Sequence, residues 1–337
     1  MKQLGLRKLV LLCGIAVLLV VYILQLALTG RQKVRELSFS DEPDSLLIQI
    51  GDDASQTVAI VKEDGAWLVG DKKYPASEST VDSLLAAIKD IKLLGEVTGR
   101  ADDAERYGLH EAGRVLVTAS KAGTVLRTLS VGKDTSTKNQ SYVQVDGKSQ
   151  IYLAGGALHG TFATTVAAVR SKAVYALDAS AITAVSVSTA SADSSLEGNF
   201  RIWKEEQASA GTEDGASVTA VAAPVWHLDA QLAEAVELDE SKVSSWVNSL
   251  ASLNVDAWLD DAGSAWTPEI VLTLEAGGTS YTVSLFASYT DAAAGEGEEE
   301  PQKQYTASCS ETPYCFTLPT YVLPRFQKKL SDLKKEG

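Results

Sequence analysis

The sequence repeats one pattern of apolar residues at a spacing of 162 residues. The first copy of the pattern follows Ser77 and the second follows Asp239, and both residue types are common helix N-caps. The apolar positions are Val81, Leu84, Leu85, Ile88 and Ile91 in the first copy, and Val243, Trp246, Val247, Leu250 and Leu253 in the second. This spacing predicts an amphipathic helix between Ser77 and Leu94 and another between Asp239 and Leu253. The chain is therefore constrained to two similar units, each containing one such helix.

Segments with the two-residue alternation typical of β-strands flank both predicted helices. In the first copy these segments are 46–50, 57–61, 115–119, 126–131, 142–145 and 150–153, and in the second they are 184–188, 200–203, 270–274, 281–286, 305–308 and 314–318. Trp67 closes the strand pair before the first helix, and Trp226 closes the pair before the second. The last two strands of each copy form a hairpin, which turns at Asp146-Gly147 in the first copy and near Thr312 and Pro313 in the second.

The order β-β-α-β-β-β-β in each copy predicts an α+β fold of two tandem subdomains with mainly antiparallel sheets. We expect the first α+β repeat at 31–175 and the second at 176–330, followed by a charged tail at 331–337. Repeats of this size usually pack side by side, so the cleft between them is the default expectation for a ligand site.

An uncharged run of 20 residues, Leu9–Leu28, precedes the repeats. A helix of that length spans about 30 Å, the thickness of the hydrocarbon layer of a membrane. The run is longer than the apolar region of a cleaved signal peptide, which is the alternative interpretation. We therefore predict a transmembrane helix at 9–29 that acts as an uncleaved signal-anchor, with residues 1–8 as a cytoplasmic stub. The C-terminal part is then extracytoplasmic, and the protein is a single-pass protein of the cell membrane.

The composition excludes several classes of function. The chain carries 44 acidic against 30 basic residues, a formal net charge of −14, which argues against a nucleic-acid binder. Neither a phosphate-binding glycine loop nor a G-x-S-x-G nucleophile motif is present. The three histidines His110, His159 and His227 stand alone in the sequence, without the spacing of a zinc site. We accordingly predict no catalytic, metal-binding or cofactor-binding residues and no cofactor.

The acidic pairs Asp52-Asp53, Asp102-Asp103 and Asp260-Asp261 have the residue types needed for acid and base catalysis, but adjacent acids in turns are usually solvated. The tryptophans Trp226, Trp246, Trp258 and Trp266 allow either a groove for a sugar or peptide or an aromatic core. We favour the core, because Trp246 occupies the same helical position as Leu84.

Two cysteines lie on the last predicted hairpin, Cys309 and Cys315, at equal distances from Thr312. Residues placed in this way can face each other across an antiparallel pair, where their Cβ atoms come within reach of a disulfide. An extracytoplasmic location favours such a bond. We therefore predict a candidate disulfide between Cys309 and Cys315, with buried thiols as the alternative.

The order of several motifs resembles a known family. The motifs are GAWLV at 65–69, VDSLLAAIKDIKLL at 81–94, YGL at 107–109, RVLVTA at 114–119 and SYVQV at 141–145. Together with the apolar N-terminal run, they resemble the bacterial domain of unknown function 4340 family. One difference is that Glu111, Ala112 and Gly113 stand where the family usually has a proline. The resemblance carries over no catalytic residues. It implies an accessory role beside an ABC transporter of the gliding-motility type.

Three functions are compatible with these features. The first is a membrane-anchored extracytoplasmic binding or assembly module, held in the membrane by residues 9–29 and associated with an ABC transporter-type complex, without catalysis. The second is a cell-envelope hydrolase with its site between the repeats, which would need converging acids or a Ser-His pair. The third is a purely structural spacer.

Overall fold

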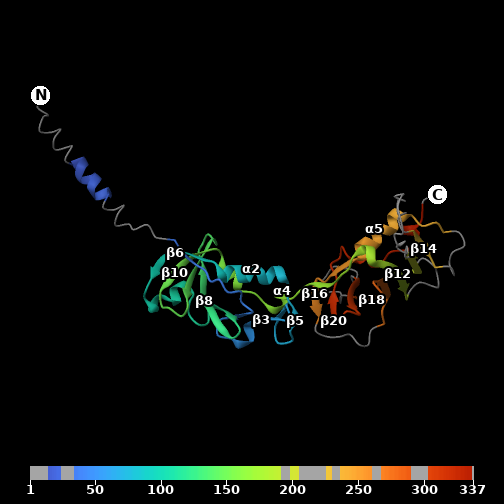
Figure 1. Ribbon diagram of the computed structural model, residues 1–337, viewed down its shortest axis with the longest axis horizontal. Coiled ribbons are helices and arrows are strands. Elements are labelled where there is room, and N and C mark those ends of the chain that lie inside the picture. Colours follow the sequence, from blue (N-terminus) through green and yellow to red (C-terminus); the bar gives the residue numbers. More distant parts are fainter. Residues whose placement is uncertain are drawn as a thin grey trace, which may run out of the picture. The chain divides into compact units, whose positions relative to one another are not determined.

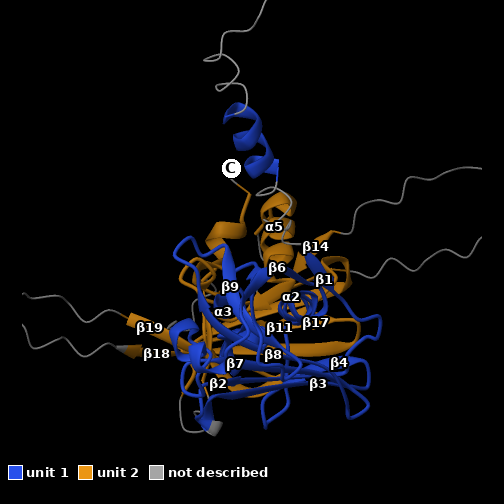
Figure 2. Cartoon of the chain, turned by 90° about the vertical axis from the view of Figure 1, so that its left-hand side faces the viewer, with its two compact units in different colours: residues 1–171 blue, residues 172–337 orange. Residues whose placement is uncertain are grey.

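The computed structural model describes residues 14–23, 34–190, 198–204, 225–229, 236–259, 267–289 and 303–335, without the side chains of Ala54 and Tyr289. The chain divides into two compact units, residues 1–171 (unit 1) and residues 172–337 (unit 2), coloured separately in Figure 2. The division lies slightly before the predicted boundary at 175. The reason is that strand β11 (Ala173–Ala176) pairs with β15 (Ser252–Asn254) and so belongs to unit 2.

Unit 1 contains one antiparallel sheet in the order β1-β6-β10-β9-β8-β7-β2-β3-β4-β5. Several of these strands are labelled in Figure 1. Its strands are β1 (Arg35–Leu37), β2 (Ser45–Ile50), β3 (Thr57–Glu63), β4 (Ala66–Val69), β5 (Tyr74–Pro75), β6 (Ile91–Thr98), β7 (Val115–Lys121), β8 (Thr124–Asp134), β9 (Gln140–Val145) and β10 (Ile151–Gly155). Buried and more exposed side chains alternate along the central strands, so that one face of the sheet supplies the core.

Between residues 34 and 171, the α-helices are α2 (Glu78–Lys89), α3 (Leu158–Phe162) and α4 (Val166–Val169). The predicted N-cap of α2 is confirmed, since the Ser77 hydroxyl accepts a hydrogen bond from the Thr80 N–H. The helix buries Val81, Leu84 and Ile88 on one face. Its predicted extension is wrong: α2 ends at Lys89, and Ile91 begins β6.

Unit 2 contains an antiparallel sheet in the order β14-β13-β12-β17-β18-β19-β20-β16, besides the pair β11-β15. Its strands are β12 (Ile182–Thr189), β13 (Asn199–Lys204), β14 (Trp226–Leu228), β16 (Ala257–Leu259), β17 (Ile270–Ala276), β18 (Thr279–Tyr289), β19 (Lys303–Cys309) and β20 (Thr312–Thr317). The helices are α5 (Glu240–Leu250) and α6 (Leu323–Phe326), followed by a 3₁₀ turn at Leu330–Leu333. Asp239 caps α5 as predicted, accepting from the N–H groups of Ser241 and Lys242.

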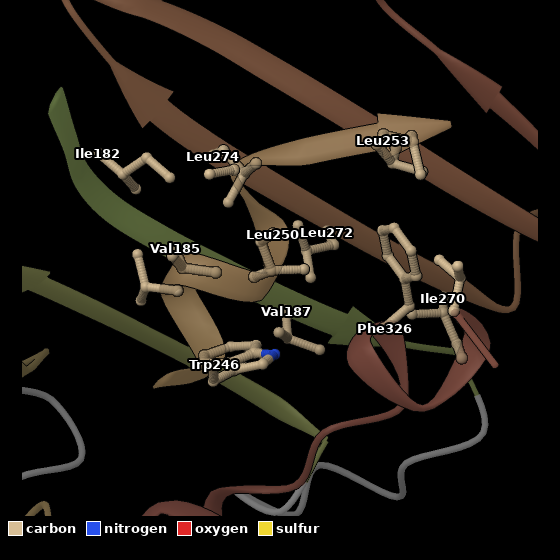
Figure 3. Packing of buried hydrophobic residues seen from close by; sticks show 14 of the residues in the cluster. Ile182, Val185, Val187, Trp246, Leu250, Leu253, Ile270, Leu272, Leu274 and Phe326 are labelled. Atoms are coloured by element: carbon tan, nitrogen blue, oxygen red, sulfur yellow. The ribbon is translucent and has the colours of Figure 1, made fainter. Parts of the chain in front are cut away.

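The core of unit 2 lies between its sheet and the helices α5 and α6 (Figure 3). Trp246 and Leu250 on α5 and Phe326 on α6 are buried together with the sheet residues Val185 and Leu272. The interpretation of Trp246 as a core residue is confirmed, since only 5% of its surface is exposed.

The two units share one topology. The sequence β2, β3, β4, α2 and β7 to β10 in unit 1 corresponds to β12, β13, β14, α5 and β17 to β20 in unit 2, with the same neighbours in each sheet. The strand before each set, β1 or β11, pairs with the strand after the helix, β6 or β15. The protein is thus an α+β protein, mostly antiparallel β with a few short helices, as predicted. The simpler β-β-α-β-β-β-β order omitted β1, β5, β6, β11, β15, β16 and the short C-terminal helices.

The last hairpin turns earlier than predicted. Cys309 pairs with Thr312, so that Ser310 and Glu311 form the turn, and Thr312 and Pro313 belong to β20. In unit 1 the predicted Asp146-Gly147 turn is confirmed, with positive φ angles at both residues.

The predicted membrane segment 9–29 lies only partly within the described residues. Residues 14–23 are helical, and their large apolar side chains are exposed. Over the described ranges, no helix combines the length and the apolarity that a membrane crossing requires.

Candidate functional site

The three histidines lie in different elements of the structure. His110 is in the turn before β7, His159 is in α3, and the His227 ring lies 5.0 Å from the Trp203 ring. Across the described residues, no group of three or more His, Cys, Asp or Glu side chains is arranged to hold a metal ion.

The acidic pairs within the described residues serve local structure. Asp53 accepts a hydrogen bond from the Ser55 N–H at 2.8 Å, and hydrogen bonding to Ser55 lowers the pKa of Asp53. Asp103 accepts from the Thr98 hydroxyl at 2.8 Å. The Asp260-Asp261 pair lies outside the described residues.

A buried serine lies beside an aspartate in unit 1. The Ser141 hydroxyl is 2.6 Å from Asp134 Oδ1 and 2.8 Å from the Gly156 carbonyl, and it accepts from the Leu158 N–H at 2.7 Å. Ser141 has no exposed surface. Because Ser141 is fully buried and its hydroxyl contacts all three of these groups, Ser141 positions the start of α3.

The predicted facing of the two cysteines is wrong. Ala307 pairs with Phe316, and both are buried in the core of unit 2 with Cys309. Cys315 is next to Phe316 along β20 and pairs with Leu259 on β16, so it lies on the opposite face of the sheet. Both cysteines are buried thiols, and no disulfide joins them. The early turn and a register shift between Ala307 and Cys309 remove the symmetry on which the disulfide was predicted.

A concave site in unit 2 is an open groove with a volume of about 540 Å³. We call it the α5–α6 groove. It is lined by Ser241, Lys242, Ser245, Trp246, Ser249, Pro324, Arg325, Lys328 and Asp332. The serines recur every four residues along α5, so they form one wall about 12 Å long. Residues of α6 and of the turn after it form the other wall.

Two hydrogen bonds join the walls of the α5–α6 groove. The Trp246 indole Nε1–H donates to the Arg325 carbonyl at 2.8 Å, and Arg325 Nη1 donates to the Ser249 carbonyl at 2.8 Å. The buried indole thus holds α6 against α5, while the guanidinium is fixed by a backbone oxygen. Sequence reasoning identified Trp246 but missed Arg325 and Lys328. Three basic residues lie close together at 325–329 in an otherwise acidic chain, and this cluster could have indicated a site for an anion.

The groove carries positive charge. Lys242, Arg325 and Lys328 line it, against the single acid Asp332. Lys328 Nζ lies 4.0 Å from Asp332 Oδ2, which also accepts a hydrogen bond from the Lys329 N–H at 3.0 Å. A pocket with this lining favours an anion.

A smaller pocket of about 240 Å³ lies in unit 1. Its lining is uncharged and consists of Ile50, Ser55, Gln56, Thr57, Val58, Thr164, Thr165 and Val166. The two pockets therefore differ in the chemistry of the ligand that they suit.

The YGL motif is a packing element. Gly108 has a φ of +72°, and Leu109 is buried with 3% of its surface exposed. A Cβ atom added to Gly132 on β8 would lie 2.2 Å from the Tyr107 carbonyl oxygen, so the motif lies directly over the backbone of this strand. The turn after the motif forms without the proline, through a hydrogen bond from Gly113 N–H to the His110 carbonyl.

The comparisons with known proteins give one result. No curated protein and no solved structure matches the chain. One family model, a domain of unknown function (DUF4340), matches residues 67–268, which begin in β4 of unit 1 and end shortly before β17 of unit 2. Because the match covers more than half of the sequence and extends across both units, the chain belongs to the DUF4340 family.

Proposed function

We propose that this protein is a membrane-anchored, extracytoplasmic binding or assembly module without catalytic activity. The observation that carries the proposal is the α5–α6 groove, a charged concave site whose walls are joined by two hydrogen bonds. Binding sites are commonly concave and carry a few fixed polar groups of this kind.

The N-terminal helix supports the anchor. Between residues 14 and 23 the exposed fractions of the large apolar side chains are about one half or more, from 49% for Val21 to 70% for Leu18. Contiguous apolar surface of this kind is stable in a lipid environment and costly in water. Three basic residues flank the run on each side, so the proposed cytoplasmic N-terminus rests on the added charge of the amino terminus, the shortness of the head at 1–8 and the acidic residues that follow on the other side.

The proposed partner is an ABC transporter-type membrane complex, which the family resemblance implies. The proposed role is to hold a ligand or a subunit beside that complex on the outer side. The cell-envelope hydrolase and the structural spacer remain alternatives, and activity assays on the full chain would distinguish the first of them.

Membrane anchoring is tested by alkaline extraction of membranes that contain the full-length protein. We expect the protein to stay in the membrane fraction, and the double variant Leu18→Lys/Leu19→Lys to be released, since a lysine at the centre of a bilayer costs about 3 kcal/mol. The matched control is Val97→Lys/Val125→Lys, which adds the same charge at exposed positions of unit 1. Release of the unaltered protein would contradict the anchor.

Orientation and partner are tested in the same membranes. Because Cys309 and Cys315 are buried, labelling needs an introduced thiol, and Tyr321→Cys places one where the native side chain is 72% exposed. We expect a membrane-impermeant maleimide to label this cysteine in intact cells, and crosslinking to recover transporter subunits. Labelling only after lysis would contradict the extracytoplasmic location, and recovery of no membrane protein would contradict the assembly role.

A further inference from the structure

The repeat allows the α5–α6 groove to be compared with the same place in unit 1. Ser77 N–H donates to the Val169 carbonyl, and Asp239 N–H donates to the Leu333 carbonyl. The pairs Ser77/Asp239 and Val169/Leu333 are therefore equivalent. The buried residues Phe162 and Phe326 lie equally far before the second pair, so the helices that form both walls correspond residue by residue.

The charges of the groove are specific to unit 2. In unit 1 the residue equivalent to Arg325 is Thr161, and the residue equivalent to Lys328 is Thr164. Elsewhere in the groove, Lys242 corresponds to Thr80 and Asp332 corresponds to Ala168. Since the scaffold is the same in both units, folding does not require cations at these positions. In unit 2 two of these cations also donate to backbone carbonyl groups, Lys242 Nζ to Lys334 at 3.3 Å and Arg325 Nη1 to Ser249 at 2.8 Å. The charge that unit 1 lacks is therefore only partly explained by packing, and Lys328 and the other N–H groups of Arg325 point to a further role.

Arg325 is arranged to bind an acid group. Its guanidinium carries five N–H donors, and the bond from Nη1 to the Ser249 carbonyl uses one of them. Among the residues that the structure describes, no carboxylate forms an ion pair with Arg325. The Arg325 guanidinium is half-buried, and its partner at Ser249 is a neutral carbonyl group. Its positive charge is therefore not neutralised by that contact, and its other N–H groups can bind a ligand.

Lys328 and the serines extend the same site. Lys328 lies at the limit of an ion pair with Asp332, at 4.0 Å, so an incoming anion can compete for its ammonium group. Ser241 and Ser245 present exposed hydroxyl groups along α5. Together they offer two cations for one acid group and hydrogen bonds for polar atoms beside it.

We infer that the α5–α6 groove binds the acid group, a carboxylate or a phosphate, of a polar anionic ligand, with Arg325 and Lys328 as its direct contacts. This inference rests on the proposed binding function and names the ligand class. Trp246 lines the groove, but its ring is turned into the core and only 5% of its surface is exposed, whereas Ser241 and Ser245 are exposed and Arg325 and Lys328 are half-buried. The acid group and adjoining hydroxyls are therefore the recognised features.

The test is calorimetric titration of the full-length protein in detergent, with glycerol phosphate as the phosphate probe, glutarate as the carboxylate probe and glycerol as the neutral control. We expect saturable one-site binding of at least one acid, no binding of glycerol, and weakening with added salt. The probe that binds more tightly shows whether the groove prefers a phosphate or a carboxylate. Absence of saturable binding of both acids would overturn the inference.

Variants separate the groove from general charge effects. Arg325→Gln/Lys328→Gln should weaken binding at least about tenfold, because it removes charge-assisted hydrogen bonds. The control Arg114→Gln/Lys148→Gln removes the same charge from unit 1 and should leave binding unchanged. The double variant also loses the Arg325–Ser249 hydrogen bond and could misfold for that reason. Lys328→Gln alone keeps this bond, and we expect it to weaken binding while the protein stays folded. Equal effects of both double variants would overturn the inference.

Failure of the groove and failure of the proposed function are distinguishable. If crosslinking recovers a membrane complex equally well with Arg325→Gln/Lys328→Gln and neither acid binds, the assembly role stands and the groove is not its ligand site. If the acids bind and no complex is recovered, the groove stands and the partner is wrong.

Discussion

The backbone N–H of Asp239 donates a hydrogen bond to the carbonyl oxygen of Leu333, 2.9 Å away. The bond connects the N-cap residue of α5 to the 3₁₀ turn at Leu330–Leu333. Ser77 and Val169 form the same bond in unit 1 at 2.8 Å. In each unit the last helical turn therefore contacts the start of the long helix. The N-cap residue donates its backbone N–H to that turn and accepts, through its side chain, from the first turn of the helix.

The N-cap side chain should stabilise the long helix in both units. We expect Asp239→Ala to lower the stability of α5 by about 1 kcal/mol, because two N–H groups lose their acceptor. Asp239→Ser should retain most of the stability of α5, because serine is the N-cap residue of α2. Hydrogen exchange of the α5 amides measures the effect. Unchanged exchange in Asp239→Ala would contradict this role of the carboxylate.

Removing the Tyr175 hydroxyl should stabilise unit 2. This oxygen is buried and has no hydrogen-bond partner among the described residues. An unpaired buried hydroxyl costs about 1 kcal/mol or more, so Tyr175→Phe should raise the free energy of unfolding by a similar amount. Urea denaturation at pH 7 measures the change. The control is Tyr321→Phe, at an exposed tyrosine, and a lower stability of Tyr175→Phe would refute the prediction.

Unit 2 should lose stability in alkali. Burial raises the pKa of Tyr175 and of Cys309 above their ordinary values of 10.0 and 9.0. Above pH 9 the unfolded chain therefore releases protons that the folded chain still holds, and the free energy of unfolding falls as pH rises. Denaturant midpoints between pH 7 and 11 should show this fall, and Tyr175→Phe should reduce it. A flat profile would be inconsistent with both shifts.

Cys309 and Cys315 should remain thiols under oxidising conditions. They lie on opposite faces of β19 and β20 and are both buried. Burial also raises the pKa of Cys309, so little thiolate is present at neutral pH. We expect slow alkylation in the folded protein and rapid alkylation in urea. Intact mass should show no loss of two hydrogens, and a Cys309–Cys315 peptide after digestion would contradict the observed register.

Gly132→Ala should destabilise unit 1. The added methyl group would meet the Tyr107 carbonyl at 2.2 Å, so the YGL segment would have to move off β8. Overpacking of this kind costs about 1–3 kcal/mol or more. Gly155→Ala on β10 is the control, since its Cβ would have ordinary contacts at 3.9 Å. Thermal unfolding should separate the two variants, and equal melting temperatures would count against the packing role of the motif.

Local patterns in the sequence were sufficient to predict most of the scaffold. The apolar periodicity gave α2 and α5 with their caps, and alternation gave the central strands. The strand β6 was missed because Ile91 continues the helical spacing of Val81 and Ile88, although the helix ends two residues earlier, at Lys89. Only the pairing of β6 with β1 and β10 decides its structure, and single-sequence periodicity does not contain that information.

The site was less predictable than the fold. Trp246 was identified correctly as a core residue, but its indole N–H also places α6, a helix of four residues that carries no periodic signal. Arg325 and Lys328 reach the groove only through that placement. The cysteine pairing failed for a similar reason, because one register shift exchanges the faces of a strand.

The bond that closes each unit joins two backbone groups, and Ser77 and Val169 in one unit correspond to Asp239 and Leu333 in the other. A hydrogen bond between backbone groups forms with different side chains on either residue. After a gene duplication, either copy could therefore accumulate substitutions on its surface while its fold remained closed. The threonines of the first copy and the cations of the second are the kind of divergence that this tolerance permits.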